Sequence, residues 1–379
     1  MEEVIDLLCK LISIPSVSGE EQKIAEFVSN YFKGEVGIEP KIDEMYNVIV
    51  EYDTGKTGPN LLLTAHLDTV QAGSGWTYDP YKPTMIDDRI YGLGASDSKG
   101  TIAPMMTSCK NCIKEAAKKL KGKLLVALTT QEENPVGEID GLRYALRKGL
   151  KSDLALFGNG YIENYMPYLT IGHNGFIRYQ IRVIGKGAHS STPELGINAI
   201  EKAFGVIKAM KSVKLPKQMI LGGEIKATMN VGVIRGGTQP NAVPTECTII
   251  GDRRTLPMEK ADKVIARYEK ALEKAKEGDP ELKYEAKFEK LHDSYLIPED
   301  DEKVQKVKAI MRKILKAEPR MRHDLCYYDA DYLAAAGIPT IMIGTSVIGT
   351  PHQPNEYNLV KNVISVEKVY TALIQGLLA

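Results

Sequence analysis

The chain has 379 residues, 43% of them hydrophobic and 26% charged, which is ordinary for a globular protein with room for two domains. Lys plus Arg equals Asp plus Glu at 49 each, so no net field favours nucleic acid, and no apolar run could span a membrane. Five scattered cysteines and an N-terminus without a secretory signal predict a cytoplasmic protein without a disulfide framework. Cys109 and Cys112 form a C-x-x-C without a second pair, which favours two helix thiols over a zinc or redox site.

Four continuous apolar runs each end in polar residues. They are NLLLTAHLD, ending at His66 and Asp68; KLLVALTTQEEN, at Glu132 and Glu133; DLALFGNGY, at Asn159 and Gly160; and IPTIMIGTSVIGTPH, leading to His352. Continuous hydrophobicity indicates strands covered on both faces, as in a parallel α/β sheet, and helical stretches separate the runs. Because ligands bind beyond the carboxyl ends of such strands, we expect these polar residues to share one rim.

The middle of the chain has a different pattern. GFIRYQIRVIG alternates apolar and polar residues, which predicts a half-buried strand. Helices and strands then follow in the order β-α-β-β-α-β, which is that of a ferredoxin-like unit. We therefore predict a first catalytic segment at 1–173, an inserted α+β domain at 174–290 and a second catalytic segment at 291–379.

His66 and Asp68 lie two apart on extended chain, so both side chains face one way. A lone strand-end histidine is usually structural, but a neighbouring carboxylate can hold the tautomer of a metal-bound imidazole. Asp97 stands in the glycine-bounded stretch GLGASDSKG, either as a turn residue or as a carboxylate that bridges two metal ions. The stretch is not a dinucleotide fingerprint, because G-x-G-x-x-G would require glycine at position 97.

Glu132 and Glu133 follow a buried strand, where adjacent acids repel each other unless a positive charge lies near. On extended chain they would point in opposite directions, so one could bind metal while the other acts as a general base. A solvated loop is the alternative. His352, in GTPHQPNE, would alone be a surface histidine, but it completes a set of imidazoles and carboxylates that suits zinc or related ions.

These residues resemble the co-catalytic zinc hydrolases that include acetylornithine deacetylase, succinyl-diaminopimelate desuccinylase, carboxypeptidase G and several di- and tripeptidases. The likeness covers essentially the whole chain, in IPSVSGEE, AHLDTV, W-x-x-D-P, YGLGASDSKG, QEE, GKGAHSSTPELGINAI, GGTQPNAVP, GDRRTLP and PHQPNE. It implies a zinc-peptidase-like α/β domain, with a mostly parallel sheet flanked by helices, interrupted by a smaller lid domain that often dimerises. The inserted ferredoxin-like unit fits that lid.

The resemblance implies a role for each matching residue around the metals. His66 would bind one ion, Asp97 would bridge, and Glu133 and His352 would hold the second ion. Glu132 would be the general base. The expected ions are two Zn²⁺, with Co²⁺ or Mn²⁺ as alternatives.

The resemblance also implies roles outside the ligand set. Asp68 would steady His66, and His189 in the lid would stabilise the oxyanion, commonly across a dimer. Asn241 and Arg254 would grip the substrate, and Arg254 suits a carboxylate.

One position departs from the family pattern. Asn159 stands where relatives carry Glu or Asp as the third ligand of the His66 metal, and a neutral amide is a poorer ligand. Three readings follow: the site binds its ion weakly, Glu163 substitutes, or Asn159 deamidates before Gly160. His173 also stands where relatives frequently carry a basic residue, a difference that bears less directly on the choice of substrate.

The predicted function is hydrolysis of the amide bond of an N-acyl-amino acid, as in a deacetylase or desuccinylase, through a metal-activated water. A di- or tripeptidase, or an aminoacyl peptidase, of the same family shares every motif and is the first alternative. A non-catalytic relative that binds an amino acid or peptide at a weakened metal site is the second. We expect a homodimer through the lid, a small-molecule substrate, and neither nucleic acid nor membrane as a partner.

Overall fold

The computed structural model describes residues 2–379, which form two compact units. The first unit comprises 2–172, Ile297–Arg322 and Asp329–Ala379; the second comprises His173–Leu296 and His323–Tyr328. Two short strands, β17 (Tyr295–Leu296) and β18 (Met321–Asp324), lie where the chain passes from one unit to the other. The predicted domain boundaries at 174 and 290 stay a prediction.

The first unit is built on a mixed sheet whose centre is parallel. Apart from the two short strands β17 and β18, its strands run in the order β1 (Lys41–Ile42), β2 (Val48–Asp53), β6 (Lys123–Thr129), β3 (Asn60–His66), β7 (Leu154–Phe157), β19 (Thr340–Met342) and β10 (Leu169–His173). Pairing is parallel from β6 through β3 and β7 to β19 and antiparallel toward both edges. The four central strands are the four apolar runs of the sequence. The predicted α/β class is confirmed, but the sheet is parallel only at its centre.

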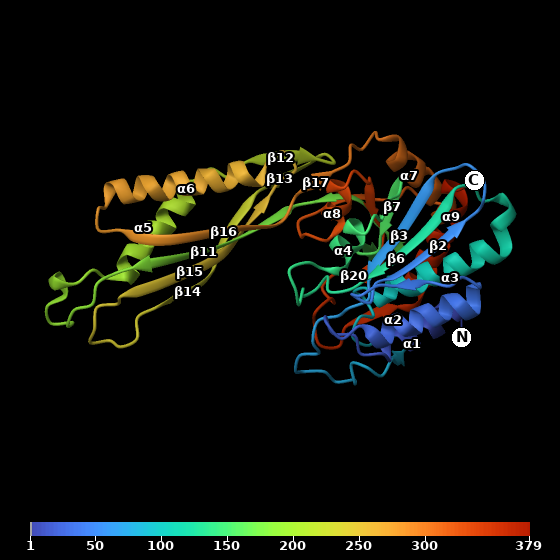
Figure 1. The fold of residues 1–379 in the computed structure, drawn as a ribbon, viewed down its shortest axis with the longest axis horizontal. Coiled ribbons are helices and arrows are strands. Elements are labelled where there is room, and N and C mark those ends of the chain that lie inside the picture. Colours follow the sequence, from blue (N-terminus) through green and yellow to red (C-terminus); the bar gives the residue numbers. More distant parts are fainter. Residues whose placement is uncertain (1) are drawn as a thin grey trace. The chain divides into compact units, whose positions relative to one another are not determined.

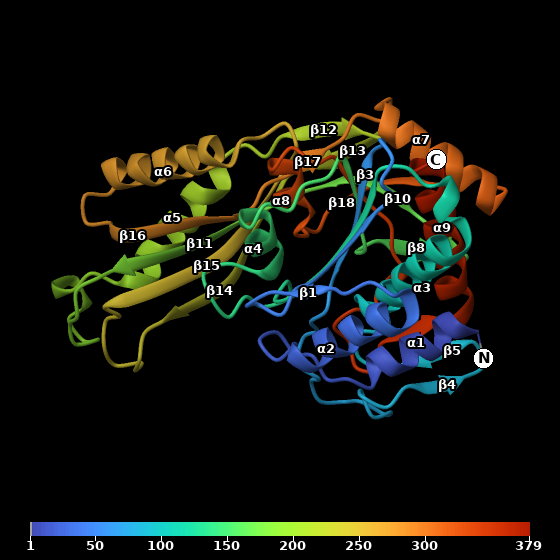
Figure 2. The same ribbon diagram turned by 45° about the vertical axis from the view of Figure 1, so that its right-hand side comes forward.

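Helices cover both faces of this sheet, which explains why the central strands are continuously apolar. Figure 1 shows α3 and α9 on one side and α4 and α8 on the other, and Figure 2 shows α1 beside α3. The helices of this unit are α1 (Glu3–Ile12), α2 (Gln22–Tyr31), α3 (Lys99–Ala116), α4 (Gly141–Arg147), α7 (Glu302–Leu315), α8 (Ala330–Ala335) and α9 (Val360–Leu377). Cys109 and Cys112 are buried in α3 as free thiols.

Two small three-stranded sheets flank the rim that the central strands point to. One contains β20 (Ser346–Val347), β8 (Tyr161–Glu163) and β9 (Met166–Pro167); the other contains β21 (Tyr357–Leu359), β5 (Arg89–Tyr91) and β4 (Thr84–Ile86). Short helical turns lie at Phe32–Val36, Ala117–Lys119 and Pro193–Leu195. None of the helices found between residues 2 and 379 has the length and apolar character needed to cross a bilayer.

The second unit is a four-stranded antiparallel sheet with two helices on one face (Figure 1). The strand order is β14 (Thr228–Gly236), β15 (Glu246–Thr255), β11 (Gly175–Ile184) and β16 (Lys283–His292), and the helices are α5 (Ala199–Ser212) and α6 (Ala261–Gly278). As the alternation predicts, every second residue of β11 from Ile177 to Val183 enters the core, and the arginines between them are exposed. This is the predicted ferredoxin-like arrangement, extended by an unpredicted hairpin of β12 (Lys217–Ile220) and β13 (Gly223–Lys226).

Candidate metal centre

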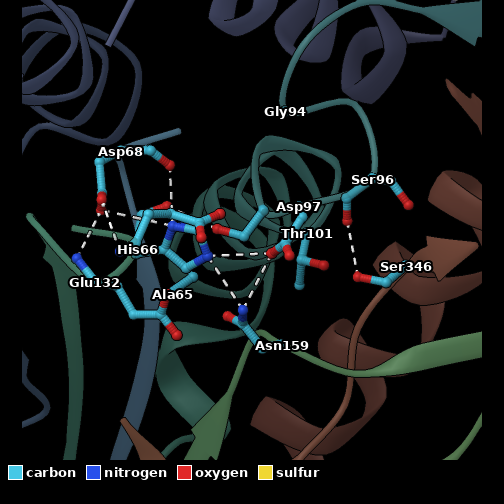
Figure 3. Close-up of polar contacts among 12 residues, drawn as sticks. Ala65, His66, Asp68, Gly94, Ser96, Asp97, Thr101, Glu132, Asn159 and Ser346 are labelled. Atoms are coloured by element: carbon cyan, nitrogen blue, oxygen red, sulfur yellow. Dashed lines mark hydrogen bonds and ion pairs between the residues drawn. The ribbon is translucent and has the colours of Figure 1, made fainter. Parts of the chain in front are cut away.

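His66 is the last residue of β3 and is almost fully buried. Its Nδ1 lies 2.9 Å from the backbone carbonyl oxygen of Asp68, so an Nδ1–H can donate there and leave the Nε2 lone pair facing the rim. Nε2 lies 3.1 Å from Asp97 Oδ1 (Figure 3). From the sequence, the Asp68 carboxylate is expected to fix the tautomer of His66. That carboxylate lies 3.6 Å from Nδ1, however, and the Asp68 carbonyl makes the closer contact.

The Asp68 carboxylate instead holds the segment that follows β6. Its two oxygens accept the backbone N–H groups of Glu132 and Glu133 at 3.1 and 3.0 Å, and one of them also accepts the Ser18 hydroxyl at 2.7 Å. Burial alone would raise the pKa of Asp68, but the neighbouring His66 imidazole and these donors lower it below the usual range. Asp68 therefore remains an anion that fixes the position of both glutamates.

The two glutamates do not lie on extended chain, which corrects the expectation that they point in opposite directions. Gln131 has a φ of 61°, and its N–H is held by the buried Glu21 carboxylate at 3.0 Å. With this turn, one ligand atom from each of His66, Glu132 and Glu133 lies within 4.8 Å of the others. Both carboxylates thus face the same centre as the imidazole.

A second group of three shares Glu133 with the first. Asp97 precedes α3, and His352 lies in the loop between β20 and β21. The Nε2 atom of His352 lies 2.8 Å from Glu133 Oε1 and 3.8 Å from Asp97 Oδ2. One ligand atom from each of these three residues lies within 4.8 Å of the others. The structure therefore brings together all four firmly predicted ligands and Glu132.

The pKa values of this centre are shifted because several carboxyl groups are buried close together. Burial, reinforced by the neighbouring carboxylates, raises the pKa of Glu132 to about 8 and also raises that of Glu133. The hydrogen bond to Glu133 raises the pKa of His352 to about 9. Burial opposes a charge on His66, yet the surrounding carboxylates raise its pKa well above the usual value. Protons thus supply the positive charge that a cation would supply in their place.

Asn159 lies two residues after the end of β7 and faces the same centre. Its Nδ2 lies 3.1 Å from both His66 Nε2 and Asp97 Oδ1 (Figure 3). Its buried Oδ1 has no hydrogen-bond partner among residues 2–379. Because amide oxygen and nitrogen are assigned from the surrounding network, a cation would favour the rotated amide, with the oxygen turned to the centre. The unpaired oxygen thus fits a weak third ligand.

Glu163 does not substitute for Asn159, and that reading is wrong. Its side chain is 44% exposed in β8, where it accepts a hydrogen bond from the Tyr168 hydroxyl at 2.8 Å and pairs with Arg320. It is absent from both groups of candidate ligands found between residues 2 and 379.

The residues predicted for the lid lie in the second unit. His189 and Asn241 are exposed and occupy two loops that join through backbone pairing, and His189 Nδ1 lies 2.7 Å from the Ser191 hydroxyl. Arg254, in β15, binds Asp252 at 3.1 Å and lies 4.4 Å from the Phe176 ring centre and 5.1 Å from that of Tyr327. The two rings orient the guanidinium, and Asp252 pairs with its Nε atom.

Comparison with known proteins supports the resemblance drawn from the motifs. Residues 171–280 match the family model of the peptidase dimerisation domain. Acetylornithine deacetylase of Salmonella typhimurium is 29% identical over 373 residues, covering 93% of this chain and 92% of the relative.

Two solved structures share the fold over nearly the full length. A tripeptidase of Staphylococcus aureus has a TM-score of 0.82 at 22% identity and covers 99% of this chain and 97% of its own. An M20 family metallo-carboxypeptidase of Sulfolobus solfataricus also reaches 0.82, at 18% identity, with 99% of both chains covered. The comparisons confirm the predicted resemblance and the predicted fold class, and the similar proteins support the predicted enzyme class, a metal-dependent hydrolase of amide bonds. The roles of individual site residues stay predictions.

Proposed function

We propose that this chain, similar to acetylornithine deacetylases over 93% of its length, hydrolyses the amide bond of an N-acyl-amino acid with two divalent cations. The observation that supports this best is the convergence of ligand atoms of Asp97, Glu133 and His352 within 4.8 Å, with His66 Nε2 3.1 Å from the other oxygen of Asp97. Nitrogen and carboxylate ligands in this mixture suit Zn²⁺ first and Co²⁺ or Mn²⁺ next.

We assign the ligands as the sequence predicts. His66 and Asp97 hold one ion, with Asn159 as a weak third donor, and Asp97, Glu133 and His352 hold the other. When bound, such ions polarise a carbonyl and make water a stronger acid. The protons that the centre retains without them must leave on binding, so this part of the chain is built to exchange protons for cations.

Glu132 is our candidate for the general base. It shares the first group with His66 and Glu133, and its backbone is fixed by Asp68. Burial gives it a pKa of about 8, and a neighbouring cation would lower that value toward the range in which a carboxylate accepts a proton from water and returns it to the leaving amine.

Arg254 and Asn241 are our candidates for substrate binding. Arg254 keeps a 27% exposed side chain on a sheet strand, and its guanidinium could pair with a substrate carboxylate through two hydrogen bonds. His189 is our candidate for stabilising the oxyanion. These assignments favour a substrate that carries a free carboxylate next to the bond to be broken.

Two rivals remain open. A di- or tripeptidase would need the same ligands and the same base. A non-catalytic binding protein is favoured by one observation, the neutral Asn159 beside His66 Nε2.

The deciding experiment supplies the purified chain with Zn²⁺, Co²⁺ or Mn²⁺ and a panel of N-acetyl and N-succinyl amino acids, dipeptides and tripeptides. Release of acetate or succinate identifies a deacylase, and release of free amino acids from peptides identifies a peptidase. The Glu132→Gln variant should lose roughly 100- to 10,000-fold in kcat, the usual contribution of a general base.

Glu138→Gln is the matched control, because Glu138 is an exposed acid on the same segment. It should keep wild-type activity. Hydrolysis that survives Glu132→Gln would refute the assigned base. If no metal gives Glu132-dependent hydrolysis of any compound, the binding protein becomes the better reading.

A further inference from the structure

Glu356 is a buried acid close to the metal centre that has no role in the proposal above. It is 1% exposed and stands four residues after His352, immediately before β21. Its carboxylate accepts three backbone N–H groups of one loop: Ser96 at 2.7 Å and Asp97 at 3.0 Å on Oε1, and Gly94 at 3.1 Å on Oε2. One side chain therefore satisfies most of the backbone donors around the bridging aspartate.

The backbone of Glu356 reinforces the same link. Its carbonyl accepts the N–H of Gly92 at 3.0 Å, and its own N–H donates to Gln353 in the His352 loop at 3.2 Å. The loop that carries Asp97 and the loop that carries His352 are thus joined through one residue. These two ligands come from distant parts of the sequence, so their spacing depends on such a link.

The Asp97 loop is also tightly enclosed, so it can transmit this restraint. Gly94 has a φ of +82°, and a Cβ there would lie 2.9 Å from the buried Lys99 side chain. On the other side, the Ser346 hydroxyl donates to the Ser96 carbonyl at 2.8 Å (Figure 3). A loop packed in this way follows its hydrogen-bond anchors rather than relaxing around them.

We propose that Glu356 is a positioning residue that sets the Asp97 carboxylate against His352 and so fixes the geometry of the metal centre. This inference rests on the proposed function, because it presumes that Asp97 and His352 share a cation. Ionised carboxylate oxygens only accept hydrogen bonds, which matches three converging donors, whereas an amide would turn an NH₂ group toward one of them. Residues that orient ligands in this way typically contribute about 10- to 100-fold to metal affinity.

The test compares Glu356→Gln with Asn355→Gly in the full-length protein. Asn355 anchors the same loop elsewhere, by accepting the N–H of Thr77 at 2.8 Å, and glycine keeps its φ of 62° without strain. Co²⁺ affinity is measured by competition with a chelator, and the geometry of the centre by the visible spectrum of the Co²⁺ form. We expect Glu356→Gln to weaken Co²⁺ binding about 10- to 100-fold, change the spectrum and lower kcat with little change in KM. Asn355→Gly should match the wild type in all three.

Wild-type Co²⁺ affinity and spectrum in Glu356→Gln would overturn the proposal. If that variant does not fold by circular dichroism, Glu356→Asp decides, because it keeps the charge but is one methylene too short to reach all three donors. Glu356→Asp should show a smaller shift in the same direction, and wild-type behaviour there would also overturn the proposal. Metal binding needs no turnover, so a wild type that binds Co²⁺ but hydrolyses nothing would defeat the proposed function while leaving this test intact.

Discussion

Asn159 is a neutral residue at a position where the neighbouring candidate ligands favour a carboxylate. It places a neutral amide 3.1 Å from His66 Nε2, at a point where a cation would gain most from a carboxylate. Asn159→Asp should therefore raise the affinity for the more weakly bound ion by at least about tenfold, which corresponds to about 1.4 kcal/mol. Isothermal titration and elemental analysis of the dialysed protein would measure affinity and stoichiometry.

Asn134→Asp is the control for this change, because it adds the same charge at an exposed position next to Glu133. It should leave the stoichiometry as in the wild type. Equal binding by Asn159→Asp and the wild type would mean that residue 159 lies outside the coordination sphere.

For single residues, the sequence predicted which candidate ligands lie together better than it predicted the hydrogen bonds that hold them in place. His66 and Glu133 could be anticipated because each follows an apolar run, and such runs end at a common rim. The hydrogen bonds from both glutamates to Asp68 could not be anticipated, because they depend on the left-handed conformation of Gln131. Nothing in the sequence TTQEEN predicts that conformation. Ser18 and Glu356 lay inside recognised motifs, IPSVSGEE and PHQPNE, but a motif does not state which atom binds which.

At the scale of secondary structure, the central strands were predictable and the additions to them were not. Continuous burial on both faces leaves a clear signature in the apolar runs of β3 and β6. The antiparallel edges leave a weaker one, since β2 is only partly buried. The β12–β13 hairpin turns through Leu221 and Gly222, both at positive φ, and a leucine in such a turn gives no sequence signal.

His323, in strand β18, should make the free energy of unfolding depend on pH. Burial, with His173 as a second cause, lowers the pKa of His323 to about 4, against about 6.5 in the unfolded chain. As the pH falls from 6.5 to 4, the unfolded state therefore gains a proton that the folded state does not, and stability is lost. The loss from this residue is at most roughly 3 kcal/mol.

His323→Gln removes the titrating group and can still donate to Asn174 Oδ1, which lies 3.0 Å from His323 Nε2. The thermal midpoint of the variant should fall less steeply than that of the wild type between pH 6.5 and 4.5. The comparison cancels the carboxylates, which titrate equally in both proteins. Parallel profiles would contradict a buried, neutral His323.

The oligomeric state of the protein can be predicted, because residues 171–280 match a peptidase dimerisation domain. We expect a homodimer of about 84 kDa, twice the chain mass of 41.9 kDa. Among the large apolar side chains that the second unit exposes, we expect such an interface to cover Phe204 on α5, 63% exposed, and Ile234 on the edge strand β14, 48% exposed. β14 is also an edge strand of its sheet, with backbone groups available for pairing.

Phe204→Glu should weaken the dimer, because it buries a charge where an aromatic side chain would be covered. A central aromatic contact is typically worth about 2 kcal/mol or more, roughly thirtyfold in the dissociation constant. Sedimentation velocity over a range of concentrations measures this constant for wild type and variant. Met258→Glu is the control, since Met258 is similarly exposed at 59% but lies in the turn between β15 and α6. A wild type that sediments as a monomer at tens of micromolar would contradict the homodimer. A Met258→Glu variant as impaired as Phe204→Glu would show that the loss is not specific to the face that carries Phe204.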